Sequence, residues 1–491
     1  MTRLKNSVLR NSIKWHKWLG WAGGFALLLF TVSAMMHPLM LWTGPRATSF
    51  FPPQLKIQAE YIAAIPDILQ QHQISRARII KVVPASGGAL LQITTDNEKA
   101  RRYFDLKSGK ELKDHDQQQA VWLARFYSGL KNTEIKNVKF QTRFDNSYPW
   151  VNRLLPVYRI TFNTEDNRTL FIHTELSALG NITNNWKTGL QTILQTLHTW
   201  NWLDDFEYIR TGIMVLLLLA LLSMAIAGLS MIFLMKSRAI RENKRRLHRY
   251  MAIIVWVPLV MLSVSGLYHL LYQSFPDNNR DRHIASPIKL HPSMFSKDTG
   301  WIDQFNGKHL NNLGIIKSPE GELLYRLSIP NGKAGQNISK SHHFNGAVHE
   351  KKAWYINTAT GAQSRLTDRE TAIHYATRYT GHHKDLISDA RLITRFSPAY
   401  DFRNKRLPVW QIDYKTGKGD TVFIDPANAI LVDHIVSTTR YESLSFSILH
   451  KWNFITPYIG RFPRDLITIL ILSLSIALTI MGYMMLLKRR R

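Results

Sequence analysis

The chain has 491 residues, a formal net charge of +28 and no cysteine. The absence of cysteine excludes disulfides, cysteine-ligated iron–sulfur clusters and haem attached covalently through C-x-x-C-H. In a soluble protein this charge would suggest nucleic acid as a partner. Long uncharged apolar runs instead place the chain among membrane proteins, so we expect a lipid bilayer and no nucleic acid.

Four apolar runs are long enough to cross a bilayer as helices, for which about 20 residues suffice. We predict transmembrane helices over residues 18–42, 211–235, 250–275 and 466–487. The first run is too long for the apolar region of a signal peptide, and no small-residue cleavage site follows it. It is therefore predicted to be a retained helix.

Lysine and arginine gather in three short segments outside these runs, namely 1–17, 236–249 and 488–491. The positive-inside rule puts such segments in the cytoplasm, and with them both ends of the chain. The two long segments 43–210 and 276–465 are then predicted to lie on the outer side of the membrane. Their modest excess of basic residues favours anionic ligands there.

The two halves of the chain repeat each other. "TRFDNSYPWVNRLLPVYRITF" at 142–162 corresponds to "TRFSPAYDFRNKRLPVWQIDY" at 394–414, and "LHTWN" corresponds to "LHKWN" before spans two and four. We infer an internal duplication in which each half is a helix, an outer segment and a helix, arranged as parallel repeats. The number of residues that separates corresponding positions of the two halves increases partway along the repeat. This increase indicates a histidine-rich insertion at 331–350 in the second half.

The outer segments alternate helical and strand patterns. "AEYIAAIPDILQQH" and "QQQAVWLARFYSGL" space apolar residues as helices do, whereas "ARIIKVVPA", "RRYFDLKSG" and "PVYRITFN" have strand composition. The predicted fold class is an α+β membrane protein with four transmembrane helices and two large outer α/β lobes. Each lobe is expected to contain about two units of a helix followed by a β-hairpin.

Four histidines lie near the edges of the first and third spans. His16 and His37 are 21 residues apart, as are His248 and His269. That spacing corresponds to about 31 Å of helix, close to the hydrocarbon thickness, and leaves both histidines on roughly one side of their helix. We therefore expect His16 to face His248 on the inner side and His37 to face His269 on the outer side.

Each of these pairs could supply two axial nitrogens to one haem iron. Small residues that would leave room for a flat macrocycle lie three or four positions away on the same helix faces: Gly20, Ser33, Ala34, Ala252, Ser265 and Gly266. Close helix packing is the rival explanation for these small residues. Anchoring in the headgroup layer is the rival explanation for the histidines, although an ionisable residue in a span indicates function by default.

His198 and His450 precede spans two and four, each beside tryptophans. They could be alternative axial ligands, a third haem pair or contacts to a substrate. The alternative is an interfacial aromatic belt that includes a polar side chain by chance. The sequence reasoning leaves these choices open.

Two further histidine groups could bind a metal ion, although polar loops of this kind are more often simply solvated. They are His342, His343 and His349 in the insertion, and His382 and His383 in "GHHK". No motif for a flavin, a nicotinamide or ATP is present, and no catalytic nucleophile is indicated.

"WHKWLGWAGGF…TVSAMMH", "LHRYMAI…SVSGLYH" and hairpins such as "YINTATGAQ" and "VFIDPANAILV" resemble the PepSY-associated transmembrane proteins over nearly the whole chain. The resemblance implies a bacterial inner-membrane protein with PepSY-like periplasmic lobes and haem b between its helices. Together with the two histidine pairs and the absence of cysteine, it leads us to expect two non-covalent haem b groups. It also implies transmembrane electron transfer, since this often iron-regulated family includes a haem-containing ferric-siderophore reductase.

We therefore expect electrons from an unidentified cytoplasmic or membrane donor to reduce a ferric chelate or siderophore in the periplasm. Candidate ligands of the haem iron are His16, His248, His37, His269, His198 and His450. Two alternatives remain at this point. The lobes could form a non-enzymatic binding or regulatory module with the helices as anchors, or the chain could be an iron-chelate transporter.

Overall fold

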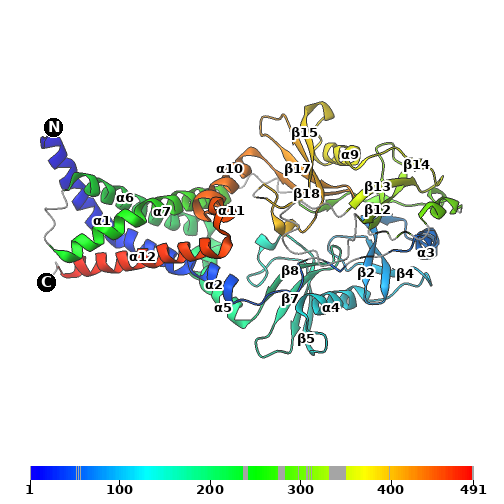
Figure 1. Cartoon of the computed structure of the whole chain (residues 1–491), viewed down its shortest axis with the longest axis horizontal. Helices are drawn as coiled ribbons and strands as arrows, with labels where there is room; N and C mark the ends of the chain where they lie inside the picture. The colour runs from blue at the N-terminus through cyan, green and yellow to red at the C-terminus, as the bar shows by residue number, and fades with distance from the viewer. Residues whose placement is uncertain are drawn as a thin grey trace. The chain divides into compact units, whose positions relative to one another are not determined.

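The computed structural model describes residues 2–50, 52, 53, 55, 57–235, 242–274, 282–296, 298–305, 308, 310, 312–330, 350–397 and 399–488. The chain combines helices and sheets, and it divides into two compact units (Figure 1). The helical unit comprises Met1–Gly44, Trp186–Asn278 and Thr439–Arg491. The sheet unit comprises Pro45–Asn185 and Asn279–Thr438.

The predicted α+β class is confirmed, and so is the presence of four helices long and apolar enough to cross a membrane in the described part of the chain. The first is α1 (Thr2–Ala34) continued by α2 (Met36–Thr43), and the others are α6 (Glu207–Leu234), α7 (Asn243–Ser274) and α12 (Arg461–Lys488). The break after Ala34 precedes Pro38, which has no N–H to donate to the Ala34 carbonyl.

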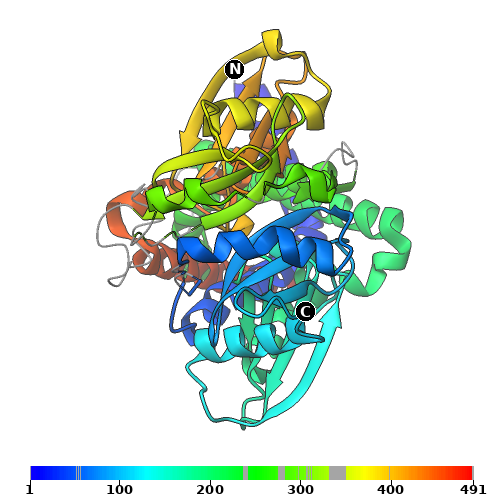
Figure 2. The same ribbon diagram turned by 90° about the vertical axis from the view of Figure 1, so that its right-hand side faces the viewer.

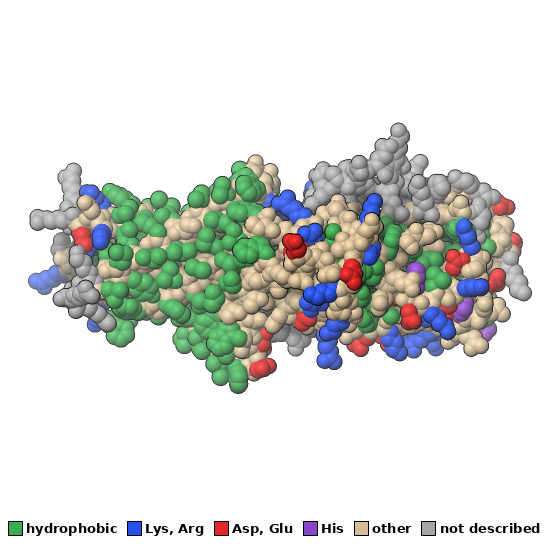
Figure 3. Space-filling model, turned by 90° about the horizontal axis from the view of Figure 1, so that it is seen from below, with side chains coloured by type: hydrophobic (Ala, Val, Ile, Leu, Met, Phe, Trp, Pro, Cys, Tyr) green, Lys and Arg blue, Asp and Glu red, His purple; other side chains and the backbone are tan. Residues whose placement is uncertain are grey.

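These helices form a bundle in which α1 and α7 each contact both α6 and α12. Helices α1 and α7 therefore occupy diagonal positions. A Cβ atom at Gly23 would lie 3.2 Å from the Ala220 carbonyl oxygen, so glycine permits the close approach of α1 to α6. Hydrophobic side chains dominate the face of the bundle seen in Figure 3, as expected for a lipid-facing surface.

Short helical segments precede α6 and α12. Before α6 they are α5 (Asn185–Leu194), a π-helical turn η3 (Gln195–Thr199) and a 3₁₀ segment η4 (Asn201–Phe206). Before α12 they are α10 (Ser437–Ser445), a π-helical turn η10 (Phe446–His450), η11 (Asn453–Ile455) and α11 (Thr456–Ile459). Trp200 directly precedes η4, and Trp452 directly precedes η11. Both residues have left-handed φ values, 52° and 50° respectively. The π-helical turns place His198 and His450 at equivalent points of the two segments, and such turns often mark functional sites.

The sheet unit is built on antiparallel sheets that draw on both halves of the chain. One seven-stranded sheet has the order β14 (Gln363–Ser364), β13 (Glu350–Asn357), β12 (Leu323–Pro330), β11 (Asn312–Lys317), β2 (Ile79–Ala85), β3 (Gly88–Thr94) and β4 (Arg102–Asp105). Its two halves join where β11 pairs with β2. The segments predicted as two lobes thus share one sheet.

The remaining strands form three smaller sheets. A four-stranded sheet contains β5 (Ile135–Gln141), β6 (Val157–Phe162), β7 (Thr169–His173) and β8 (Ala178–Thr183). A five-stranded sheet contains β15 (Ile387–Ile393), β16 (Val409–Tyr414), β17 (Thr421–Asp425), β18 (Ile430–Ile435) and β9 (Ile284–Ala285). A short pair joins β1 (Arg76–Ala77) to β10 (Ile288–Lys289).

Helices cover these sheets through their apolar faces. Helix α4 (His115–Ser128) packs on β6, β7 and β8, and α9 (Asp368–Thr380) packs on the five-stranded sheet (Figure 2). Helix α3 (Ala64–Gln71), entered through the 3₁₀ turn η1 (Ala59–Ala63), shares the core of the seven-stranded sheet. Other 3₁₀ turns are η2 (Trp150–Asn152), η6 (Pro292–Met294), η7 (Gly300–Phe305), η8 (Lys384–Leu386) and η9 (Phe402–Asn404).

A buried ionic cluster joins the halves inside the sheet unit. Lys81 Nζ lies 2.7 Å from Glu175 Oε1, and Arg406 donates to both Glu175 and Asp425, with a distance of 3.0 Å to Asp425 Oδ2. Burial alone would raise the pKa of Glu175, but the Arg406 and Lys81 cations hold that pKa well below its ordinary value. Because these charges have little contact with water, their mutual pairing is a condition of folding.

Two histidines beside this cluster make the stability of the sheet unit dependent on pH. Burial lowers the pKa of His173 well below its usual value and lowers the pKa of His283 to about 3; the nearby Arg101 and Arg406 cations act in the same direction. The unfolded chain would bind these protons near pH 6.5, whereas the folded chain excludes them. We therefore expect stability to fall as pH decreases through and below about 6.5.

Thermal unfolding of the purified protein between pH 7.5 and 5, followed by tryptophan fluorescence, would measure this dependence. His283→Gln should flatten the decline, whereas the exposed His383→Gln should not alter it. An unfolding temperature that stays constant over this range would contradict the expectation.

Candidate functional site

The candidate site consists of histidine rings that face one another inside the helical bundle. On the diagonal helices α1 and α7, the ring centroids of His16 and His248 are 6.4 Å apart, with an angle of 75° between the ring planes. This is the pair that the sequence predicted for one side of the membrane. Both residues are half-buried.

The surroundings of the His16/His248 pair orient the His16 ring and leave space for both rings. His16 Nδ1–H donates to the Met224 carbonyl over 3.0 Å, which leaves Nε2 as the nitrogen with a free lone pair. A Cβ atom at Gly228 would lie 3.3 Å from His16 Cε1, and one at Gly482 would lie 3.4 Å from His248 Cε1. Glycines on α6 and α12 thus leave space for the two rings.

A second pair is formed by His198 and His450 in the π-helical turns. Their ring centroids are 6.3 Å apart and their planes are inclined at 76°, nearly the same geometry as in the first pair. The histidine that precedes α6 therefore faces the histidine that precedes α12. The sequence had left open whether these two histidines were ligands, substrate contacts or interfacial residues.

Two serines orient this second pair. Ser33 Oγ donates its only proton to the Leu29 carbonyl at 2.7 Å, so it accepts from His198 Nδ1–H at 3.0 Å. Ser265 acts in the same way, donating to the Leu262 carbonyl and accepting from His450 Nδ1–H at 3.1 Å. In both histidines Nε2 is then the nitrogen that carries the free lone pair.

His269 and His37 have different surroundings. His269 Nδ1 pairs with the buried Glu442, and the His269 ring stacks on Phe446 with centroids 4.3 Å apart. Phe446 stacks in turn on His450 at 4.6 Å. His37 lies in α2 with its side chain exposed. The second pair of facing rings is thus His198 and His450, where the sequence analysis predicted His37 and His269.

The facing pairs fit axial ligation of a haem iron. Metal–imidazole bonds of about 2 Å put the centres of two imidazoles on one iron about 6 Å apart. Both pairs have this separation, and a histidine that binds metal typically donates its other ring N–H to a nearby oxygen, as His16, His198 and His450 do.

The number of donors also favours haem over a bare metal ion. Within the described residues, no group of three or more His, Cys, Asp or Glu side chains could hold a metal ion. A bare transition metal in a structural site needs about four protein ligands, whereas haem supplies four nitrogens itself and needs one or two axial ligands. A site with two facing histidines therefore suits haem better than a bare metal ion.

Of the other histidines that could bind a metal ion, His382 and His383 lie within the described residues and do not form such a site. His382 Nε2 lies 3.2 Å from Asp420, whose other oxygen lies 3.0 Å from His434 Nε2, and His383 pairs with Asp385 at the surface. His342, His343 and His349 lie outside the described residues.

Several residues of the site were not identified from the sequence. Ser33 and Ser265 were recognised only as small residues, and their role as acceptors depends on where the π-helical turns place His198 and His450. Gly228 lies in α6 and Gly482 lies in α12, and a glycine in a long apolar helix does not by itself indicate that a histidine packs against it. Glu442 and Phe446 have no counterpart in the first half, where leucines stand at the equivalent positions 190 and 194, so the repeat gave no signal for them.

No protein-family model matches this chain, and a search of curated proteins found no match.

Proposed function

We propose that this chain is a multi-pass bacterial inner-membrane protein that holds two b-type haems and moves electrons outward to reduce a ferric chelate, such as a ferric siderophore. The observation that carries the proposal is the repeated histidine geometry. His16/His248 and His198/His450 have centroid separations of 6.4 and 6.3 Å and ring angles of 75° and 76°. Two unrelated interfacial histidine pairs would have no reason to share it.

The two pairs are suitably placed for electron transfer across the membrane. His16 and Ser33, which contacts His198, are 17 residues apart on α1, corresponding to about 25 Å of helix. Between the two levels lies an apolar core that contains Ala26, Leu27 and Val255. The charge pattern supports an inner position for the His16 pair, since the basic termini and the basic 236–249 link would be cytoplasmic.

A bound haem would supply one-electron cycling between Fe(III) and Fe(II). The chain's own residues would determine where each haem sits and how easily it is reduced. His16, His248, His198 and His450 would provide the axial nitrogens, and the Met224 carbonyl, Ser33 and Ser265 would fix the histidine tautomers. Burial among aliphatic side chains is the further means by which the chain would set the reduction potential.

The repeat supports the same proposal. Strands β6, β7 and β8 and strands β16, β17 and β18 are related by an offset of 252 residues, as are His198 and His450. We propose that a duplication produced the two halves and that the sheet unit contains PepSY-like repeats. Each half then contributes one axial ligand to each haem. The modest basic excess of the outer segments would favour an anionic ferric chelate, and reduction to Fe(II) would weaken oxygen-rich chelation.

The serine contacts yield a specific prediction. Ser33→Ala and Ser265→Ala should each weaken haem retention at the outer pair by about 10-fold, because loss of a partner that orients a metal-binding histidine typically costs 10–100-fold. Ser475→Ala is a matched control, since this buried hydroxyl donates only to the Ile471 carbonyl of its own helix. Haem content after washing with an apo-haem-binding protein would be measured. Equal retention in all three variants would contradict the proposed role.

The function can be tested in liposomes with a reductant trapped inside and a ferric chelate outside. Ferrous iron is measured outside with an Fe(II)-specific chromogenic chelator. We expect Fe(II) to form with the native chain and at least about 10-fold more slowly with a His16→Ala/His450→Ala variant, corresponding to more than about 1.4 kcal/mol in barrier height. Chelate uptake without reduction would favour a transporter, and neither uptake nor reduction would favour a binding module.

A further inference from the structure

Two turns of the sheet unit form a single surface feature. They are η2 (Trp150–Asn152) and η9 (Phe402–Asn404), and we refer to them as the paired turns. Arg153, directly after η2, donates to Asn404 Oδ1 at 2.9 Å, and Arg403 donates to the Val151 carbonyl at 3.4 Å. The two turns come from different halves of the chain and are held together by these reciprocal contacts.

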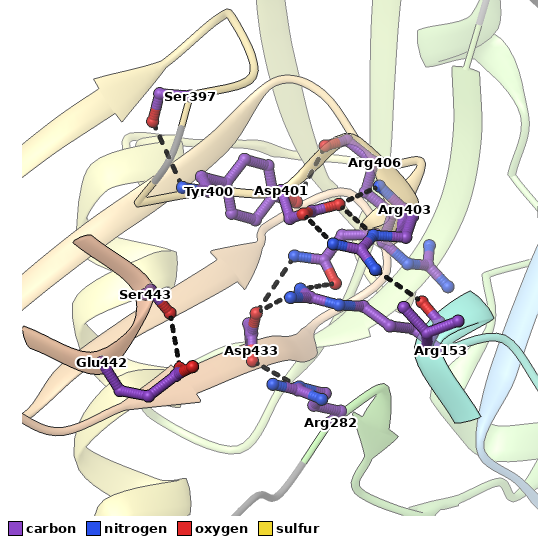
Figure 4. Close-up of polar contacts among 12 residues, drawn as sticks. Arg153, Arg282, Ser397, Tyr400, Asp401, Arg403, Arg406, Asp433, Glu442 and Ser443 are labelled. Carbon is purple, nitrogen blue, oxygen red and sulfur yellow. Dashed lines mark hydrogen bonds and ion pairs between the residues drawn. The ribbon is translucent and has the colours of Figure 1, made fainter. Parts of the chain in front are cut away.

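The paired turns rest on buried charges. Asp433 is 2% exposed and accepts from Arg153 at 2.7 Å, from Arg282 at 2.7 Å and from Asn404 at 3.2 Å. In Figure 4 the guanidinium groups of Arg153 and Arg282 reach Asp433 from different sides. The Arg153 and Arg282 cations, with hydrogen bonds from Arg282 and Asn404, keep the pKa of Asp433 below its ordinary value even though burial alone would raise it. These contacts hold the paired turns in position, and with them the side chains that the turns expose to solvent.

Aromatic side chains project from this base. Trp150 is 50% exposed and Phe402 is 39% exposed, both high values for large apolar side chains. Lys405 Nζ lies 5.2 Å from the Phe402 ring and 4.9 Å from the ring of Phe50. Exposed aromatic rings beside lysine and arginine have the composition of residues that settle at a membrane–water interface, where the rings meet headgroups and the cations meet phosphates.

Chain connectivity limits how far the base of the paired turns can lie from the ends of the membrane-spanning helices. Phe50 follows closely after Pro45, where the sheet unit begins, and Arg282 follows closely after Asn279, where the unit resumes. Asp433 comes shortly before Thr438, where it ends. Each residue spans at most about 3.5 Å, so the base of the paired turns cannot lie more than a few tens of ångströms from the ends of the spans.

We propose that the paired turns are a lipid-contacting foot that inserts Trp150 and Phe402 into the headgroup layer, with Lys405 meeting anionic headgroups; Arg403 instead forms an ion pair with Asp401. The proposal does not depend on haem. It assigns to these turns a role in holding the sheet unit at the membrane surface. A ferric chelate, or a partner protein seated on the same rings, is a competing occupant that the test separates.

The absence of cysteine makes the test direct, because a single introduced cysteine can be labelled uniquely. A spin label at Val151→Cys leaves Trp150 in place, and Glu98→Cys provides a label at an exposed position of another loop. Collision rates with oxygen and with a water-soluble nickel complex report the depth of each label in vesicles of phosphatidylethanolamine with 20–30% phosphatidylglycerol, roughly the share needed to attract basic residues.

We expect the label at 151 to have a several-fold higher ratio of oxygen to nickel collisions than the label at 98, and Trp150→Ala to lower that ratio. A label at Phe402→Cys repeats the measurement if the first variant does not fold. A label at 151 that behaves like the one at 98 would overturn the proposal. So would a label shielded from both oxygen and nickel, since it would be covered by protein rather than by lipid.

Discussion

Replacing His450 with alanine is expected to remove one of the two proposed haems and to leave the other in place. His450 and His198 face each other at 6.3 Å, and either alone would supply only one of the two axial nitrogens of the haem proposed between them. His16→Ala should remove the other haem instead. A pyridine haemochrome assay on protein purified in mild detergent would measure the haem content of each variant.

The remaining histidines provide the control for this result. His37 has an exposed side chain and His269 is engaged by Glu442 and Phe446, so His37→Ala and His269→Ala should both retain two haems. A His198→Ala/His450→Ala double variant should lose no more haem than either single variant. Loss of a haem from His269→Ala, with retention in His450→Ala, would mean that the outer ligands are those expected from helix spacing alone.

Replacing Glu175 with alanine should destabilise the sheet unit by about 3–5 kcal/mol, since removing one partner of a buried ion pair leaves uncompensated buried charge. Glu175 is 3% exposed and serves both Lys81 and Arg406, so two cations would lose this carboxylate. Glu98→Ala is the matched control, because its side chain is exposed and should change stability by no more than about 0.5 kcal/mol.

Denaturant unfolding of the purified protein, read out by limited proteolysis of the sheet unit, would measure this difference. A second check replaces Lys81, Glu175, Arg406 and Asp425 together with apolar residues of similar size. This variant should recover part of the loss, because no charge of the cluster is then left buried without its partner. A change below about 1 kcal/mol in Glu175→Ala would show that the cluster is hydrated and contributes little.

The membrane helices were predictable because their signal is local and long. Uninterrupted apolar runs identified all four described helices that are long and apolar enough to cross a membrane. The repeat in the sequence identified His16 with His248, and His198 with His450, as equivalent residues. The inner pair also followed from helix geometry, since α1 and α7 are continuous through His16 and His248. Regular helices allow residue spacing to be converted directly into position.

The outer pair was not predictable in this way. His198 and His450 lie in π-helical turns, and Trp200 and Trp452, two residues after each histidine, have left-handed backbone conformations. No spacing rule anticipates where such turns direct a side chain. The contact of Ser33 with His198 joins residues 165 positions apart, and it depends on how the turn packs against α1.

The arrangement of the sheets depended on long-range pairing in the same way. The strand patterns were correct in kind, but nothing local indicated that β2 would pair with β11 and merge segments expected to form separate lobes. Likewise, Glu175 and Arg406 are 231 residues apart, and neither has a neighbour in sequence that predicts a buried ion pair. Packing and desolvation across the whole sheet unit determine which of these long-range contacts form.

The most direct test of the haem proposal is the dithionite-reduced minus oxidised absorbance spectrum of the purified protein, together with its haem content. The histidine geometry predicts sharp low-spin b-type bands and two haems per chain. A colourless protein, even after expression with added haem precursor, would contradict it, and the histidine pairs would then be packing contacts of a membrane-anchored binding module.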